Sequence, residues 1–278
     1  MSTIMKSFRL ATITLLIAFS LPVWAEAPRR IVSLKPSITD TVYALGLGER
    51  LVGVTKYCDA PDGAKKPEIA ADYTRPYTER IIGLRPDIVI GSEENSSRRS
   101  IDALRRAGLS VEIFPFTTLG ETLDSIEKIS AVLGAPERGK KLRGEIEGRL
   151  DALKKRYGDK KPANAVVVWG LKPTILAGPG TFMDDAIAYI GLTNAARGTS
   201  VRYPKIGLEQ LIAFDPDIIV DLSMDIKPGS AQERPWSNVD SIKAVREGRV
   251  IAMDPGMFRA GPRMPNALEK LAARIYGN

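Results

Sequence analysis

The chain has 278 residues, with 40 Lys and Arg, 33 Asp and Glu, and a formal net charge of +7. It contains no histidine, which excludes His-based zinc sites, Ser-His-Asp and Cys-His catalysis, and histidine ligation of haem. The basic residues are spread along the chain without interleaved aromatic residues, so we expect no nucleic-acid partner. Cys58 is the single cysteine; it cannot form an intramolecular disulfide and is expected to be a buried small side chain.

Residues 1–25 have the pattern of a secretory signal peptide. Lys6 and Arg9 supply a basic start, an apolar stretch runs from Leu10 to Phe19, and small residues end the segment at Ala25. The apolar stretch is too short for a stable membrane span, so an uncleaved anchor is the less favoured alternative. We expect cleavage after Ala25, which leaves enough chain for two domains.

In the first half, β-rich runs alternate with amphipathic segments. The strands expected here are Ile31–Leu34, Leu51–Thr55, Ile88–Ile90 and Ser110–Phe114, and the helices are Ser37–Leu45, Thr78–Leu84 and Ser100–Ala107. Arg85 precedes Pro86, which disfavours helical backbone at Arg85 and ends the second helix there. Alternation of this kind is typical of parallel α/β units.

A long amphipathic segment follows from Pro136 to Tyr157. Its apolar residues Leu142, Ile146 and Leu150 recur at helical spacing with dense charge between them, which predicts one helix roughly 33 Å long. We interpret residues 136–160 as a connector between an N-terminal lobe (26–135) and a C-terminal lobe (161–278). A single rigid connector predicts small opening and twisting motions rather than a wide clamshell closure.

The second half again alternates strands and helices. The strands expected here are Ala165–Trp169, Ile218–Leu222 and Arg249–Met253, and the helices are Thr181–Ile190, Leu208–Phe214, Val239–Val245 and Asn266–Tyr276. We therefore predict two Rossmann-like α/β lobes with central parallel sheets, joined by one long helix.

Three pairs of segments repeat each other between the two halves. Residues 79–90 and 209–220 both have a glutamate, a short apolar helix, a Pro-Asp break and a β-branched strand. Leu-Lys-Pro-Ser at 34–37 matches Leu-Lys-Pro-Thr at 171–174, and residues 102–111 match residues 240–250. A repeat over this length indicates two similar lobes with a cleft between them.

Ligands of open parallel sheets bind beyond the carboxyl ends of the strands. Aromatic and arginine residues are few in this chain but gather in loops at those positions, which suits a large, partly apolar ligand with polar edges. Trp169 could equally belong to the core, and Tyr57 and Tyr203 could instead cap the lobe cores. The candidate ligand-binding residues are Lys35, Pro36, Tyr57, Tyr73, Ser92, Trp169, Tyr203 and Arg259, whereas Tyr43, Tyr157 and Tyr276 fall on apolar helix faces and are expected in the core.

Glu79 and Glu209 occupy equivalent places at the first turns of two repeated helices. A carboxylate there complements the helix dipole, and this alone would explain both residues. Equivalent positions on two lobes also present two negative charges on one face of the molecule. A partner with matching two-fold symmetry could dock on that pair through arginines.

Three segments, residues 30–46, 52–61 and 79–90, resemble helical-backbone (class III) periplasmic solute-binding proteins of ABC importers. The resemblance covers essentially all of the chain after residue 25 and is greatest to the members that bind cobalamin. It implies a protein of the periplasm, monomeric when free, that captures a corrinoid between its lobes and delivers it to a dimeric ABC permease in the inner membrane. It also implies no catalytic residues, no resident metal and no cofactor.

The resemblance also implies roles for individual residues. Tyr57, Tyr73, Tyr203 and Arg259 fall on ligand-contacting positions, and Glu79 and Glu209 fall on the positions of the glutamates that dock on the permease. In the cobalamin-binding pattern, tryptophan stands where this chain has Tyr73 and Tyr203, and a further contacting tryptophan is expected at Ser92.

Three alternatives remain open at this stage. A ferric-siderophore binder of the same class could use Arg75, Arg202 and Arg259 to neutralise an anionic iron complex. A haem binder would need a tyrosinate ligand, because the chain has no histidine. An enzyme such as a chelatase or hydrolase on a related scaffold is least favoured, because no paired acid and base residues occur in the expected pocket loops.

Overall fold

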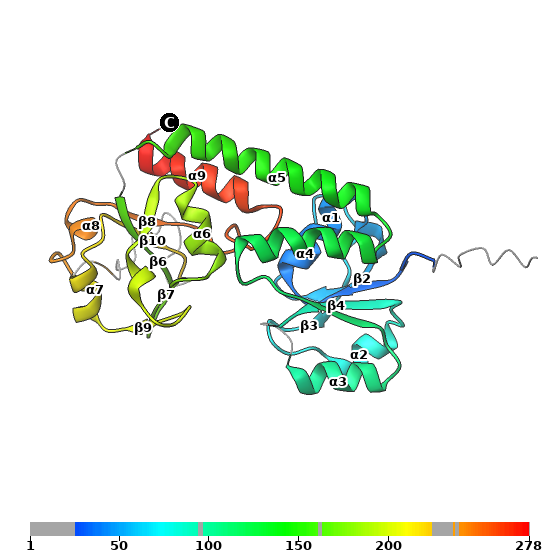
Figure 1. Ribbon diagram of the computed structural model, residues 1–278. Helices are drawn as coiled ribbons and strands as arrows, with labels where there is room; N and C mark the ends of the chain where they lie inside the picture. Colours follow the sequence, from blue (N-terminus) through cyan, green and yellow to red (C-terminus); the bar gives the residue numbers. More distant parts are fainter. Residues whose placement is uncertain (1–25, 94–96, 161–162, 224–235, 237–238, 278) are drawn as a thin grey trace, which may run out of the picture.

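The computed structural model of the chain describes residues 26–93, 97–160, 163–223, 236 and 239–277. They form two α/β lobes, and the long helix α5 (Pro136–Tyr157) runs beside both of them (Figure 1). The predicted signal peptide, residues 1–25, lies outside the described residues. Among the helices that are described, none is long and apolar enough to cross a membrane.

The N-terminal lobe is a five-stranded parallel sheet with helices on both faces. Its strands are β1 (Ile31–Ser33), β2 (Leu51–Thr55), β3 (Glu68–Ala71), β4 (Ile88–Ser92) and β5 (Val111–Phe114), and its helices are α1 (Pro36–Ala44), α2 (Thr78–Gly83), α3 (Arg98–Arg106) and α4 (Leu119–Val132). The strand order is β3-β2-β1-β4-β5. Because side chains alternate along a strand, Ile31 packs with α1 and α4 whereas Val32 packs with α2 and α3.

The C-terminal lobe has a mixed sheet. Its strands are β6 (Ala163–Leu171), β7 (Thr174–Leu176), β8 (Leu192–Asn194), β9 (Lys205–Ile206), β10 (Ile218–Asp221) and β11 (Val250–Ala252), and its helices are α6 (Phe182–Ala188), α7 (Leu208–Phe214), α8 (Lys243–Arg246) and α9 (Met264–Tyr276). Strands β6, β10 and β11 pair in parallel, as expected, and β8, which the sequence did not predict, also pairs in parallel with β6. Strands β7 and β9 add an antiparallel edge that the sequence did not predict.

Two of the three sequence repeats are also repeats of structure. Segments 79–90 and 209–220 form the units α2–β4 and α7–β10, and segments 102–111 and 240–250 form α3–β5 and α8–β11. The third pair follows a strand in both lobes, as expected, but the two copies then form different structures. Lys35-Pro36 leads from β1 into α1, but Lys172-Pro173 forms the turn of the β6–β7 hairpin, where β6 pairs antiparallel with the strand that follows.

The repeated Pro-Asp pair ties each helix–strand junction to the first strand of its own lobe. The carboxylate of Asp87 accepts a hydrogen bond of 2.9 Å from the backbone N–H of Arg30, just before β1. Asp217 accepts one of 2.8 Å from the N–H of Asn164, near the start of β6. The residues before the two prolines, Arg85 and Asp215, both adopt left-handed backbone, with φ values of 47° and 35°. The two lobes therefore present α2 and α7 through the same local geometry.

The apolar core passes without interruption through both lobes. One cluster of buried side chains includes Ile31 of the N-terminal sheet, Ile146 of α5 and Val220 of the C-terminal sheet. Polar contacts reinforce this connection, because Arg149 of α5 pairs with Glu269 of α9 at 2.7 Å. The helix predicted at Pro136–Tyr157 has these bounds in the structure, with the expected apolar face buried.

Candidate ligand-binding cleft

A cavity of about 750 Å³ lies between the lobes at the carboxyl ends of their strands. This volume is in the upper part of the usual range for ligand pockets. The segments after β1, β2 and β5 supply the N-terminal wall, and residues at the ends of β6, β10 and β11 supply the opposite wall. The lining residues are Lys35, Pro36, Ser37, Lys56, Tyr57, Asp59, Tyr73, Phe116, Trp169, Phe182, Tyr203, Leu222, Asp254, Pro255, Gly256, Phe258, Arg259 and Ala260.

The cavity brings together seven of the eight residues that the sequence singled out as ligand-binding. These are Lys35, Pro36, Tyr57, Tyr73, Trp169, Tyr203 and Arg259. Ser92 is the exception. It is fully buried as the last residue of β4, where it is still in register with Phe114 of β5, and it does not line the cavity. We therefore leave Ser92 out of the binding site.

Three partly exposed tyrosine rings line this cavity. Tyr57, Tyr73 and Tyr203 are 38%, 51% and 43% exposed, respectively. Tyr57 and Tyr73 pack edge to face, with ring centroids 5.8 Å apart and an angle of 87° between the rings, so each holds the other in place. Exposed aromatic rings that converge on one concave surface are typical of a binding site for a flat, partly apolar ligand.

Sequence reasoning missed several lining residues. Phe116 and Phe182 add aromatic surface, and Lys56, Asp59 and Asp254 add charge. A usable signal existed for Phe116, because it follows β5 by two residues and so meets the same strand-end criterion as Tyr57. Trp169, for which the sequence favoured neither the core nor the site, lines the cavity, and its indole N–H has no acceptor among the described residues.

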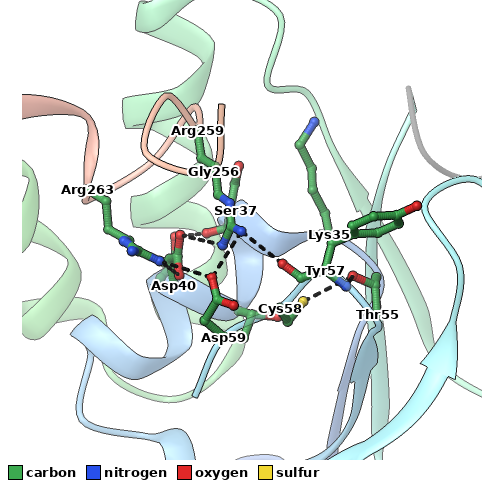
Figure 2. A network of polar contacts seen from close by, with 12 residues as sticks. Lys35, Ser37, Asp40, Thr55, Tyr57, Cys58, Asp59, Gly256, Arg259 and Arg263 are labelled. Carbon is green, nitrogen blue, oxygen red and sulfur yellow. Dashed lines mark hydrogen bonds and ion pairs between the residues drawn. The ribbon is translucent and has the colours of Figure 1, made fainter. Parts of the chain in front are cut away.

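Arg259 is the centre of a polar network that crosses between the lobes (Figure 2). Its Nη2 donates to the carbonyl oxygen of Tyr57 at 2.9 Å and to Oδ2 of Asp59 at 3.1 Å. Its Nη1 lies 3.6 Å from Oδ2 of Asp40 on α1, and Arg263 reaches both carboxylates at 3.5 and 3.7 Å. Two arginines of the C-terminal lobe thus face two aspartates of the N-terminal lobe.

The two aspartates of this network differ in their surroundings. Burial raises the pKa of Asp40 above its ordinary value, although Arg259 and Arg263 act in the opposite direction. Asp59 stands at the cavity wall with a side chain that is 68% exposed. Within the ranges that the structure describes, no three His, Cys, Asp or Glu side chains are placed to hold a metal ion.

Cys58, next to this network, should react slowly with a thiol reagent. Its Sγ lies 3.0 Å from Oγ1 of Thr39 and 3.2 Å from Oγ1 of Thr55, and burial raises its pKa. A raised pKa lowers the thiolate fraction at pH 8, so folded protein should react more slowly with a chromogenic disulfide than protein unfolded in urea. The difference should shrink as the pH rises. Equal rates at pH 8, with Cys58→Ala as the blank, would show an accessible thiol.

The sequence that forms this cleft matches a known family. The sequence model of the periplasmic binding protein family matches residues 31–256. The chain belongs to this family. It is a binding protein of the ABC importer type and not an enzyme.

Individual relatives cover nearly the whole binding protein. The vitamin B12-binding protein of Photorhabdus laumondii subsp. laumondii is 29% identical over 275 residues, which cover 98% of this chain and 96% of that protein. The crystal structure of the periplasmic vitamin B12 binding protein BtuF of Vibrio cholerae is 28% identical, with a TM-score of 0.77, and the match covers 89% of this chain and 96% of that one. The periplasmic heme-binding protein RhuT of Roseiflexus sp. RS-1, in apo form, is 29% identical with a TM-score of 0.79, covering 90% and 98%.

Glu79 and Glu209 lie outside the lining of the cavity. Each is the second residue of its helix, α2 or α7, and both side chains are exposed. Neither side chain lines the cavity, and neither makes an ion pair within the described part of the chain. An exposed isoleucine, Ile82 or Ile212, follows one turn later on each helix. The two lobes thus present the same pairing of a carboxylate and an apolar side chain.

Proposed function

We propose that the protein captures a corrinoid of the cobalamin type in the cavity between its lobes and delivers it to an ABC permease. The observation that carries this proposal is the cavity wall itself, in which exposed tyrosine rings surround charges that are largely paired. A corrinoid presents a flat apolar macrocycle with amide groups at its edges. Aromatic rings suit the macrocycle, and the polar side chains between them suit the amides.

The charges of the cavity wall favour a ligand with little net charge. Three cations line it among the described residues, Lys35, Lys56 and Arg259. Lys56 is paired with Asp72 at 2.9 Å, and Arg259 faces Asp59 and Asp40. A ferric siderophore with several carboxylates or catecholates would need cations that are not already paired. Of the three arginines considered for that alternative, Arg259 lines the cavity, and it is paired with aspartates.

The comparisons support the same ligand class without deciding between macrocycles. Relatives called vitamin B12-binding match the chain over nearly its full length, and a heme-binding neighbour shares its fold at similar identity. Haem is therefore the second candidate. The half-exposed phenol of Tyr73 at the cavity wall favours it, because a tyrosinate can ligate haem iron.

An absorption spectrum tests the two candidates directly. Purified protein is incubated with an equimolar mixture of cyanocobalamin and haemin, freed of unbound ligand and scanned in the visible range. We expect the corrinoid bands, and calorimetry with cyanocobalamin should give sub-micromolar affinity, about −9 kcal/mol or stronger. Haem bands together with no calorimetric response to cyanocobalamin would replace the corrinoid proposal by the haem proposal.

We further propose that residues 1–25 direct export to the periplasm and that Glu79 and Glu209 dock the loaded protein on the permease. The support for docking is the equivalent placement of the two carboxylates on α2 and α7, together with the fact that neither lines the cavity. Each subunit of a dimeric permease would present one basic pocket to one lobe. N-terminal sequencing of periplasmic protein, expected to begin at Glu26, tests the export proposal.

A further inference from the structure

The guanidinium of Arg259 is placed to bind an anionic ligand, but the N-terminal lobe already engages it: Nη2 donates two hydrogen bonds, and Nη1 is buried without a hydrogen-bond partner among the described residues, 3.6 Å from Oδ2 of Asp40. Its side chain is 14% exposed and lines the cavity. A planar guanidinium in such a wall would bind a ligand carboxylate through two parallel hydrogen bonds. Here the donors on Nη2 go to the Tyr57 carbonyl and to Asp59 instead. Figure 2 shows Asp59 and Asp40 on the side of the guanidinium that faces the N-terminal lobe.

The cluster has no net charge, because Asp40 and Asp59 match Arg259 and Arg263. The two aspartates have different parts in it. Asp40 is buried on α1 and serves as a positioning residue behind the guanidinium. Asp59 is largely exposed and lines the cavity, so an entering anion meets its carboxylate beside Arg259. Rejecting a competitor by repulsion is a common route to specificity.

We propose that Asp59, supported by Asp40, is a specificity-determining residue that makes the cavity discriminate against anionic ligands by occupying the guanidinium of Arg259. The inference rests on the proposed function, since it explains how an amide-edged macrocycle is selected over one that carries carboxylates. It also assigns Arg259 a new role. The residue shapes the site by holding the Tyr57 backbone across the cleft, rather than by neutralising the ligand.

The test compares ligands that share one shape and differ in charge. The probes are cyanocobalamin, which has no net charge, and its analogue with one peripheral amide hydrolysed to a carboxylate. Wild-type protein should bind the analogue with the carboxylate more weakly than cyanocobalamin. In Asp59→Asn the ratio of the two dissociation constants should fall by roughly tenfold, because the cluster then carries one uncompensated positive charge. Asp59→Glu, which keeps the charge, should retain the wild-type ratio.

A distant variant controls for the change in total charge. Glu145→Gln on α5 also removes one negative charge, from an exposed side chain outside the cavity, and should leave the ratio unchanged. An Asp59→Asn ratio equal to that of Glu145→Gln, or an equal loss of affinity for both corrinoids, overturns the inference.

Haemin separates failure of the inference from failure of the proposed function. If wild-type protein binds neither corrinoid, the proposed function is wrong, and the inference is then decided by haemin alone. Haemin carries two carboxylates, so its affinity should rise by roughly tenfold in Asp59→Asn and stay constant in Glu145→Gln. No gain for haemin in that case overturns the inference as well.

Discussion

Reversing both charges in the double variant Glu79→Arg, Glu209→Arg is expected to abolish ligand uptake through the permease. Each close charge pair across a protein interface can contribute about 1.5–7 kcal/mol, and reversal replaces attraction by repulsion at both lobes. The affinity of the isolated protein for its ligand should not change, because neither residue lines the cavity. Uptake is measured in vesicles that contain the purified permease, and affinity is measured by calorimetry on the same preparations.

Single substitutions and a matched charge change complete this experiment. Each single reversal should give partial loss, because the other lobe still docks through an equivalent glutamate. A double reversal of exposed acids on α5, Glu137→Arg with Glu145→Arg, alters total charge equally and should transport normally. Normal uptake by the Glu79, Glu209 double variant would reduce these carboxylates to helix-terminus residues that only complement the helix dipole.

Tyr73→Ala should weaken ligand binding by about 1–3 kcal/mol, or roughly 5-fold to 150-fold in the dissociation constant. The substitution removes the most exposed ring of the cavity wall and also leaves Tyr57 without its edge-to-face partner. Calorimetry on folded protein measures the change. An unaltered dissociation constant would remove Tyr73 from the binding site.

Two other substitutions show what kind of contact Tyr73 makes. Tyr73→Phe keeps the ring and should preserve corrinoid binding, whereas a haem site that uses the tyrosinate would lose its ligand. Tyr43→Ala should lower the free energy of unfolding by about 1–3 kcal/mol with little effect on affinity. The Tyr43 ring packs against the core and against Gly48, where even one added carbon would lie 2.4 Å from it.

The elements that the sequence predicted well are those whose signals are local. The apolar spacing of 136–157 gives α5 its bounds, and the Pro-Asp breaks mark β4 and β10, because a proline and an apolar period act within a few residues. Helix α4 was missed although Thr118 and Glu121 form a capping box at its start, a signal that was present in the sequence. The β6–β7 hairpin was missed because its Lys172-Pro173 turn resembles the start of α1.

The candidate site was predictable in its position and less so in its chemistry. Seven lining residues could be predicted from the rule that ligands bind beyond the carboxyl ends of parallel strands, because these ends lie at the same edge of a sheet. It could not predict that Arg259 is held by Asp59, because the two residues are 200 positions apart and only the packing of the two lobes brings them together. Ser92 was misplaced for a similar reason, because the point at which β4 stops pairing with β5 depends on the neighbouring strand.

The apolar core shared by the two lobes limits how the ligand can be released. With buried side chains continuous from one sheet through α5 to the other, and the Leu119 N–H bonded to Asp185 of α6 at 3.0 Å, the lobes cannot swing apart without breaking that core. These contacts hold the cleft in one arrangement, so ligand binding should lose little affinity to a scarcely populated competent conformation. A binding protein that does not close around its ligand gains no free energy from reopening, so reopening cannot drive ligand release. In the proposed docking mode, the permease has to supply the distortion that releases the ligand, by acting on α2 and α7.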